Sequence, residues 1–124
     1  MIGIIASVPF ESTLLRRLLT SPREITLGQK RVLRGLLKGR EVILMDSGIG
    51  KSNASHTTTL LCEIGEPDLI INHGIGGAYI NSGLKIGDVA IAKAEIYGDE
   101  GVLEEDGFHG LEKIGIPILK REHN

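Results

Sequence analysis

Two glycine-rich turns are the parts of this sequence whose residue types and spacing best suit chemistry. The first is residues 47–51, Ser-Gly-Ile-Gly-Lys, and the second is residues 73–77, His-Gly-Ile-Gly-Gly; each follows a short apolar segment. Glycine lacks the Cβ atom that would keep a ligand away, so such turns can bring bare backbone amides up to a small molecule. The pattern favours ligand-binding loops, with tight turns that bind nothing as the alternative.

Neither turn completes a nucleotide-binding pattern. Residues 47–52 end in Gly-Lys-Ser, but a phosphate loop would need glycine where Met45 stands, inside an expected strand. Residues 74–77 begin Gly-Ile-Gly but lack a third glycine that opens a helix, and no acidic residue follows at the required place in a strand–helix–strand unit. A triphosphate cradle and a dinucleotide site are therefore both poorly supported.

Glu11 is the carboxylate best placed for catalysis. It follows the apolar segment 2–6 and precedes an expected helix, so it lies at the C-terminal edge of a core strand near a glycine turn. Open α/β sheets place their ligands at that edge. A carboxylate that merely favours a helix N-terminus is an equally good interpretation.

The histidines do not indicate a metal site. His73 adjoins the second glycine turn, where a hydrogen-bonded structural histidine is commoner than a base or a ligand. The remaining histidines are dispersed and have no cysteine partner at a metal-binding spacing; they are His56, His109 and His123. We therefore expect no bound metal.

The composition favours a small globular domain over residues 1–124. The hydrophobic fraction is 41% and only 3% is aromatic, so the core must be aliphatic, as in parallel sheets covered by helices. The net charge is −2, and lysine and arginine are spread along the chain. This distribution argues against nucleic acid and anionic membranes as partners and favours a small molecule.

The order of apolar segments and turns predicts an α/β fold with a mixed, mostly parallel sheet flanked by helices. We expect helices over residues 12–19 and 52–64, the second closed by Gly65, and a weak apolar pattern at Leu111, Ile114, Ile116 and Leu119. Short turns at 28–30 and 38–40 predict hairpins. The expected strands are 2–6, 25–27, 31–37, 41–45, 68–72 and 88–96, of which 2–6, 41–45, 68–72 and 88–96 are inner strands covered on both faces.

The location expected from the sequence is the cytoplasm. Cys62 is the single cysteine, so no internal disulfide can form, and we expect it to be buried in the second helix. Residues 1–8 are apolar but lack a basic start and a cleavage-like site, and they are too few to span a bilayer. We interpret them as a first core strand, and we expect no membrane partner.

Several blocks, taken in order, resemble the amino-terminal half of the purine nucleoside phosphorylase superfamily, in particular its nucleosidases. The later blocks, from residue 95 onward, look more like futalosine hydrolase than methylthioadenosine/S-adenosylhomocysteine nucleosidase. The blocks that carry the resemblance are residues 2–5, 11–15, 47–51, 67–72, 74–77, 84–89, 95–102, 106–108, 111–115 and 117–119.

This resemblance implies hydrolysis of a purine N-glycosidic bond, with release of hypoxanthine from futalosine on a route to menaquinone and no cofactor. Glu11 matches the carboxylate that activates water, and Ile49 matches a residue on the sugar side. Ile75, Gly76 and Gly77 match the loop whose backbone contacts the purine. A fixed carboxylate suits this reaction, because it can orient water and stabilise the oxocarbenium-like state.

Other parts of the family's site have no match in these residues. The acid that protonates the purine and the Met-Glu pair that holds the ribose belong to the carboxy-terminal half, and Asp88, Asp99 and Asp106 do not lie in the matching motif. We therefore expect this chain alone to be inactive, and to associate with itself or with a complementary carboxy-terminal half. The alternatives are an enzyme like methylthioadenosine/S-adenosylhomocysteine nucleosidase and a catalytically silent nucleoside-binding domain.

Overall fold

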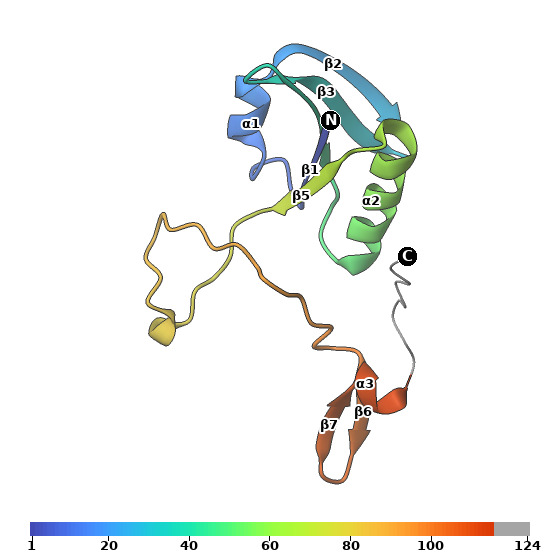
Figure 1. Cartoon of the computed structure of the whole chain (residues 1–124), viewed down its shortest axis with the longest axis vertical. Helices are drawn as coiled ribbons and strands as arrows, with labels where there is room; N and C mark the ends of the chain where they lie inside the picture. Colours follow the sequence, from blue (N-terminus) through green and yellow to red (C-terminus); the bar gives the residue numbers. More distant parts are fainter. Residues whose placement is uncertain (116–124) are drawn as a thin grey trace. The chain divides into compact units, whose positions relative to one another are not determined.

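The computed structural model describes residues 1–115, and the chain divides into two compact units, Met1–Tyr79 and Ile80–Asn124. The first unit holds a five-stranded sheet in the order β2-β3-β4-β1-β5 and two helices (Figure 1). The mixed α/β sheet expected from the sequence is confirmed, whereas the single domain over residues 1–124 stays a prediction. The elements of this unit are β1 (Ile2–Ala6), α1 (Thr13–Leu18), β2 (Thr20–Leu27), β3 (Lys30–Leu37), β4 (Arg40–Asp46), α2 (Lys51–Gly65) and β5 (Leu69–His73).

One side of the sheet is parallel and the other is antiparallel. β1 pairs in parallel with β4 on one side and β5 on the other, while β2–β3 and β3–β4 are antiparallel hairpins. Both hairpins turn through two residues with positive φ, Gly28 and Gln29 in one, Lys38 and Gly39 in the other. Such two-residue turns match the twist of the flanking strands, which confirms the hairpins expected at these places.

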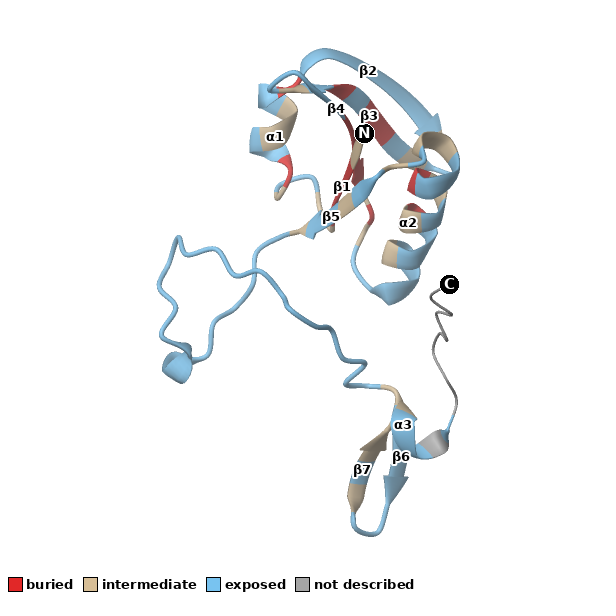
Figure 2. Cartoon of the chain, viewed as in Figure 1, coloured by how far each residue is buried: buried red, intermediate tan, exposed pale blue. Residues whose placement is uncertain are grey.

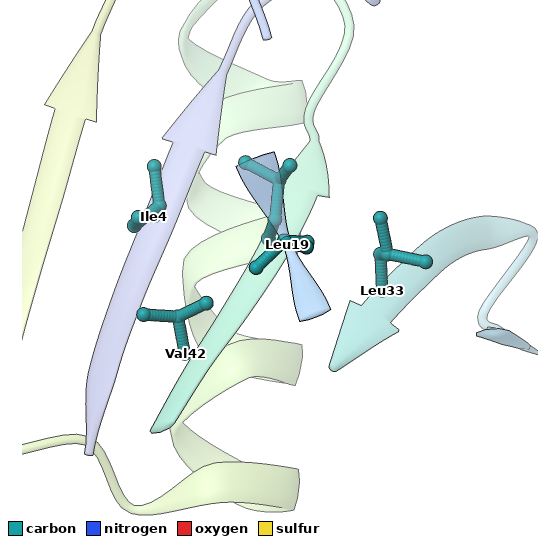
Figure 3. Close-up of a cluster of buried hydrophobic side chains, with 5 residues drawn as sticks. Ile4, Leu19, Leu33 and Val42 are labelled. Atoms are coloured by element: carbon teal, nitrogen blue, oxygen red, sulfur yellow. The ribbon is translucent and has the colours of Figure 1, made fainter. Parts of the chain in front are cut away.

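Each face of the sheet has its own apolar cluster. Side chains alternate along β1 and β4, so one cluster faces α1 and the other faces α2, and the two helices lie on opposite sides of the sheet (Figure 1). The cluster on the α1 side is Ile4, Leu19, Leu33, Val42 and Leu44, four of them labelled in Figure 3. The cluster on the α2 side is Ile5, Val32, Ile43, Met45 and Leu61.

Two of the four expected inner strands are not inner strands. Among the described strands β5 has a single neighbour and forms an edge, and its Leu69 and Ile71 are 52% and 42% exposed (Figure 2). Residues 88–96 form no strand: Val89 and Ile91 are almost fully exposed, because no described strand pairs with this segment. A continuous apolar run predicts burial only where a neighbour is present to cover it.

Of two local expectations for α2, one is confirmed and one is wrong. The helix ends at Gly65 as expected, and the left-handed residue is the next one, Glu66, with φ 42°. Gly65 is small for another reason, because a Cβ there would lie 2.8 Å from Ile43 Cδ1 and from Met1 Cε. Cys62 is free and exposed, since it lies on the outer face of the helix while Leu61 faces the sheet.

The second unit contains little regular structure. Its described part has the short 3-10 helix η1 (Ile80–Ser82), the hairpin of β6 (Gly101–Glu104) and β7 (Gly107–Gly110), and α3 (Leu111–Ile114). The expected apolar pattern begins in α3, and its last two positions, 116 and 119, lie outside the described residues. In residues 1–115, each helix is too short or too polar to cross a membrane.

Packing of β1 against α2 gives a stability prediction. A Cβ at Gly3 would lie 2.5 Å from Leu61 Cδ2, and Leu61 is fully buried. We expect Gly3→Ala to lower the free energy of unfolding by about 1–3 kcal/mol through overpacking, and Leu61→Ala to lower it by about 2–5 kcal/mol through a cavity. The double variant should lose less than the sum, because the added methyl fills the cavity. Urea unfolding measures all three, and strictly additive losses would contradict this contact.

Candidate active site

Glu11 lies where the parallel strands end. It follows the turn after β1, and its Oε2 accepts hydrogen bonds from the backbone amides of Ser7 at 3.1 Å and Val8 at 3.3 Å. Its Oε1 accepts from the amide of Ile75 at 2.9 Å. Ala6 of β1 is paired with His73 of β5, so the residues that follow both strands meet at one edge of the sheet. The half-buried carboxylate thus joins two loops that are 64 residues apart.

These hydrogen bonds set the charge on Glu11. The amide of Ile75 makes the largest contribution that lowers the pKa of the carboxyl below its ordinary value. The amides of Val8 and Ser7 and the charge of His73 act in the same direction, while partial burial opposes them. The three amides and His73 each favour the ionised form of the Glu11 carboxyl. At neutral pH the site therefore presents a carboxylate, as a general base or an electrostatic stabiliser requires.

The glycine after β5 is required by this contact. A Cβ at Gly74 would lie 2.7 Å from Glu11 Oε1, so a larger residue would push the loop off the carboxylate. Gly76 and Gly77 differ, because a Cβ at either would meet no atom within 4 Å. Their backbone faces open space beside Ile75, whose side chain is 74% exposed.

The first glycine turn reaches the same edge through β4. Its Ser47 and Gly48 amides donate to Ala6 O at 2.8 Å and Ser7 O at 2.9 Å, which extends the β1–β4 pairing into the loop. The loop is held further by Asn53 Nδ2, which donates to Ile49 O at 2.8 Å, and by Lys30 Nζ, which donates to Ser47 O at 2.5 Å. The side chain of Ile49 is 77% exposed on this braced loop.

Sequence reasoning missed a polar cluster at the same edge. Ser12, Arg16 and Asp46 are joined by hydrogen bonds directly after Glu11, although Asp46 is more than thirty residues away in the chain. The register that pairs Ala6 with Asp46 brings them together, and no local pattern reveals that register. His73 was expected to be a hydrogen-bonded histidine, yet its Nε2 is buried with no hydrogen-bond partner among the described residues.

The hairpin of the second unit gathers three possible metal ligands, Glu104, Asp106 and His109, within 4.8 Å of one another. Each already has a partner: His109 Nε2 lies 2.7 Å from Asp106 Oδ1, and Lys113 pairs with Glu104. The acidic members are exposed. This group is accounted for as a surface network of ion pairs.

Comparison with known proteins places the chain in a family. Residues 1–119 match the family described as the phosphorylase superfamily, and the chain belongs to it. A curated relative is the 5'-methylthioadenosine/S-adenosylhomocysteine nucleosidase of Listeria innocua serovar 6a, 44% identical over 103 residues. That match covers 83% of this chain and 44% of the relative, so the chain spans less than half the length of such relatives.

Solved structures from this family resemble the chain to different degrees. The methylthioadenosine/S-adenosylhomocysteine nucleosidase of Colwellia psychrerythraea, solved with adenine, has a TM-score of 0.67 and 31% identity, over 70% of this chain and 36% of that one. A futalosine hydrolase mutant of Helicobacter pylori has a TM-score of 0.57 and 28% identity, over 61% of this chain and 34% of that one. The superfamily resemblance is thus confirmed, but the likeness to futalosine hydrolase is the weaker of the two.

The amides around Glu11 predict a pH-dependent contribution to stability. Because its pKa is lowered in the folded chain, the ionised group stabilises the fold above the ordinary value of 4.5. That contribution is lost as the pH falls through the folded pKa. We expect Glu11→Gln to be less stable than the native chain at pH 7, with a difference that shrinks once the pH drops below 4.5. Urea unfolding of both proteins from pH 7 to pH 3 measures it, and a difference that stays constant would show that the amides do not hold the charge.

Proposed function

We propose that this chain forms the water-activating part of a nucleosidase that hydrolyses the N-glycosidic bond of a purine nucleoside. The observation that carries the proposal is the position of the Glu11 carboxylate, held by backbone amides between two glycine loops at the edge where β1, β4 and β5 end. In this proposal Glu11 is the catalytic carboxylate. Ile49 lines the sugar side, and the backbone of Ile75, Gly76 and Gly77 contacts the purine.

The hydrogen-bond capacity of Glu11 supports this role. An ionised carboxylate has about four acceptor positions, and the amides of Ser7, Val8 and Ile75 fill three of them. The remaining capacity suits one water molecule or one hydroxyl group. A water held there is oriented by a fixed negative charge, which also stabilises the positive charge that develops on the sugar as the glycosidic bond breaks. The mechanism requires no cofactor from this part of the site.

The substrate class that we favour is the adenine nucleosides methylthioadenosine and S-adenosylhomocysteine. It is supported by the 44% identity to the Listeria innocua nucleosidase and by the closer likeness to the adenine-bound structure. Futalosine, and with it a place in menaquinone synthesis, is the second candidate, and the Helicobacter pylori structure supports it less strongly. The blocks that favoured futalosine begin at residue 95, in the second unit, whereas Glu11 belongs to the first unit.

The partner that we propose is a complementary carboxy-terminal half, which would supply the acid for the purine and the groups that hold the ribose. One observation supports it: β5 leaves one sheet edge without a neighbour among the described strands. Such an edge invites pairing with another chain. Self-association is the other way to cover it.

A chimera tests the role of Glu11. The matched 103 residues of this chain replace their counterpart in the Listeria innocua nucleosidase, and adenine or hypoxanthine release is measured with methylthioadenosine, S-adenosylhomocysteine and futalosine. We expect adenine release, and a loss of at least about a hundredfold in kcat for Glu11→Gln with KM little changed, because the amide cannot accept a proton. The matched control Glu41→Gln, on an exposed strand position, should keep the rate. A loss of only a few fold for Glu11→Gln would exclude it as the base.

The isolated chain should release neither adenine nor hypoxanthine. It lacks the acid and the ribose-binding pair that the family resemblance assigns to the other half. Chromatographic detection of free base after prolonged incubation with the same nucleosides measures this. Turnover by the purified chain would mean that another residue supplies the acid, whereas a folded but inactive chimera would favour the silent nucleoside-binding domain.

A further inference from the structure

A closed ring of polar side chains lies directly beside Glu11. Ser12 Oγ donates to Asp46 Oδ1 at 2.8 Å, Arg16 Nε donates to Ser12 Oγ at 3.0 Å, and Arg16 Nη2 donates to Asp46 Oδ2. Ser12 is fully buried, and the side chains of Arg16 and Asp46 are only 16% and 12% exposed. We name these three residues the anchor cluster.

Burial makes the anchor cluster destabilise the fold unless its hydrogen bonds are kept. A charge withdrawn from water is tolerated only when it is paired and hydrogen-bonded, and removing one partner leaves the other uncompensated. Buried pairs of this kind contribute little net stability compared with apolar side chains of the same volume. What they do restrict is geometry, because each group has few alternative positions in which its hydrogen bonds are satisfied.

The anchor cluster joins the elements that aim Glu11. Asp46 is the last residue of β4 and is paired with Ala6, the last residue of β1. Ser12 follows Glu11 in the chain, and Ser7 and Val8, which donate to Glu11, follow Ala6. The ring therefore joins Ser12, the residue after Glu11, to Asp46 at the end of β4. This contact keeps Glu11 near the ends of β1 and β4.

We propose that Asp46, acting through Arg16 and Ser12, is a positioning residue that holds the Glu11 segment at the ends of β1 and β4. The consequence of Asp46 for catalysis rests on the proposed function. Its effect on the position of the Glu11 carboxylate does not depend on that function. Loss of the ring lets the segment move, so that Glu11 loses the amides of Ser7 and Val8.

The test is a carboxyl titration of Glu11 by NMR in the 124-residue chain labelled with ¹³C-glutamate, with Glu11→Gln used to assign the signal. We expect the midpoint to rise toward 4.5 in Asp46→Ala and in Ser12→Ala, and to rise less in Asp46→Asn, which keeps an acceptor for Ser12. Glu41→Gln is the matched control, because it breaks an exposed ion pair with Arg34 on the same sheet. It should leave the midpoint unchanged.

The direction of the shift separates positioning from a simple change of charge. His73 on β5 is the charged group that lowers the pKa of Glu11, and the charges within the anchor cluster are those of Arg16 and Asp46. Removing the negative charge of Asp46 alone would lower the midpoint of Glu11, because one repelling charge is gone. A rise therefore reports the loss of the amides.

An unchanged or lower midpoint in folded Asp46→Ala and Ser12→Ala overturns the proposal. If Asp46→Ala does not fold, Ser12→Ala decides alone, since it keeps both charges and removes one hydroxyl. The titration needs no substrate, so its outcome is independent of the chimera. A chimera unaffected by Glu11→Gln would sink the proposed function and leave the positioning result standing.

Discussion

The candidate site depends on one carboxylate held by backbone amides. Hydrogen bonds to an ionised acceptor are about twice as strong as neutral ones, and Glu11 accepts three of them from residues that follow two different strands. The same bonds keep the group charged and fix where it points. They also explain why glycine stands at position 74, since a Cβ there would displace the Ile75 amide from the carboxylate.

Parallel pairing makes this arrangement possible. β1 lies between β4 and β5, and Ala6 is paired with Asp46 on one side and His73 on the other. All three strands therefore end at one edge, and the segments that follow them converge there. In an antiparallel sheet successive strands would end at opposite edges, and the two glycine loops would lie apart. The apolar clusters on both faces hold β1 and β4 in register.

The sequence predicts the parts of the fold that local physics determines. Residues 2–6 and 42–45 are apolar, with a helix on either face of the sheet. Short turns whose residues adopt positive φ produce the two hairpins. The sequence predicts wrongly that residues 88–96 form a strand and that β5 is covered on both faces. An apolar run indicates that a segment can be covered but does not say which neighbour covers it. Among the described strands, none lies beside residues 88–96 or on the outer side of β5.

The same distinction applies to the site. The placement of Glu11 and of the two glycine turns at one edge follows from the rule that parallel strands end together, so the sequence could predict their convergence. The anchor cluster and the His73 Nε2 without a hydrogen-bond partner among the described residues could not be predicted in this way, because they depend on the pairing register and on side-chain packing between distant segments. The family resemblance pointed to the right superfamily, whereas its finer likeness rested on residues outside the sheet.

The central claim is that the edge carrying Glu11 is the nucleoside site of this chain, and mapping of a bound purine by amide NMR tests it most directly. Adenine is titrated into the ¹⁵N-labelled chain and every resolved amide is followed. We expect the largest shifts to fall on Ile75, Gly76 and Gly77, with smaller ones in residues 47–50. Shifts confined to the second unit, or no shift in either loop at millimolar adenine, would contradict it.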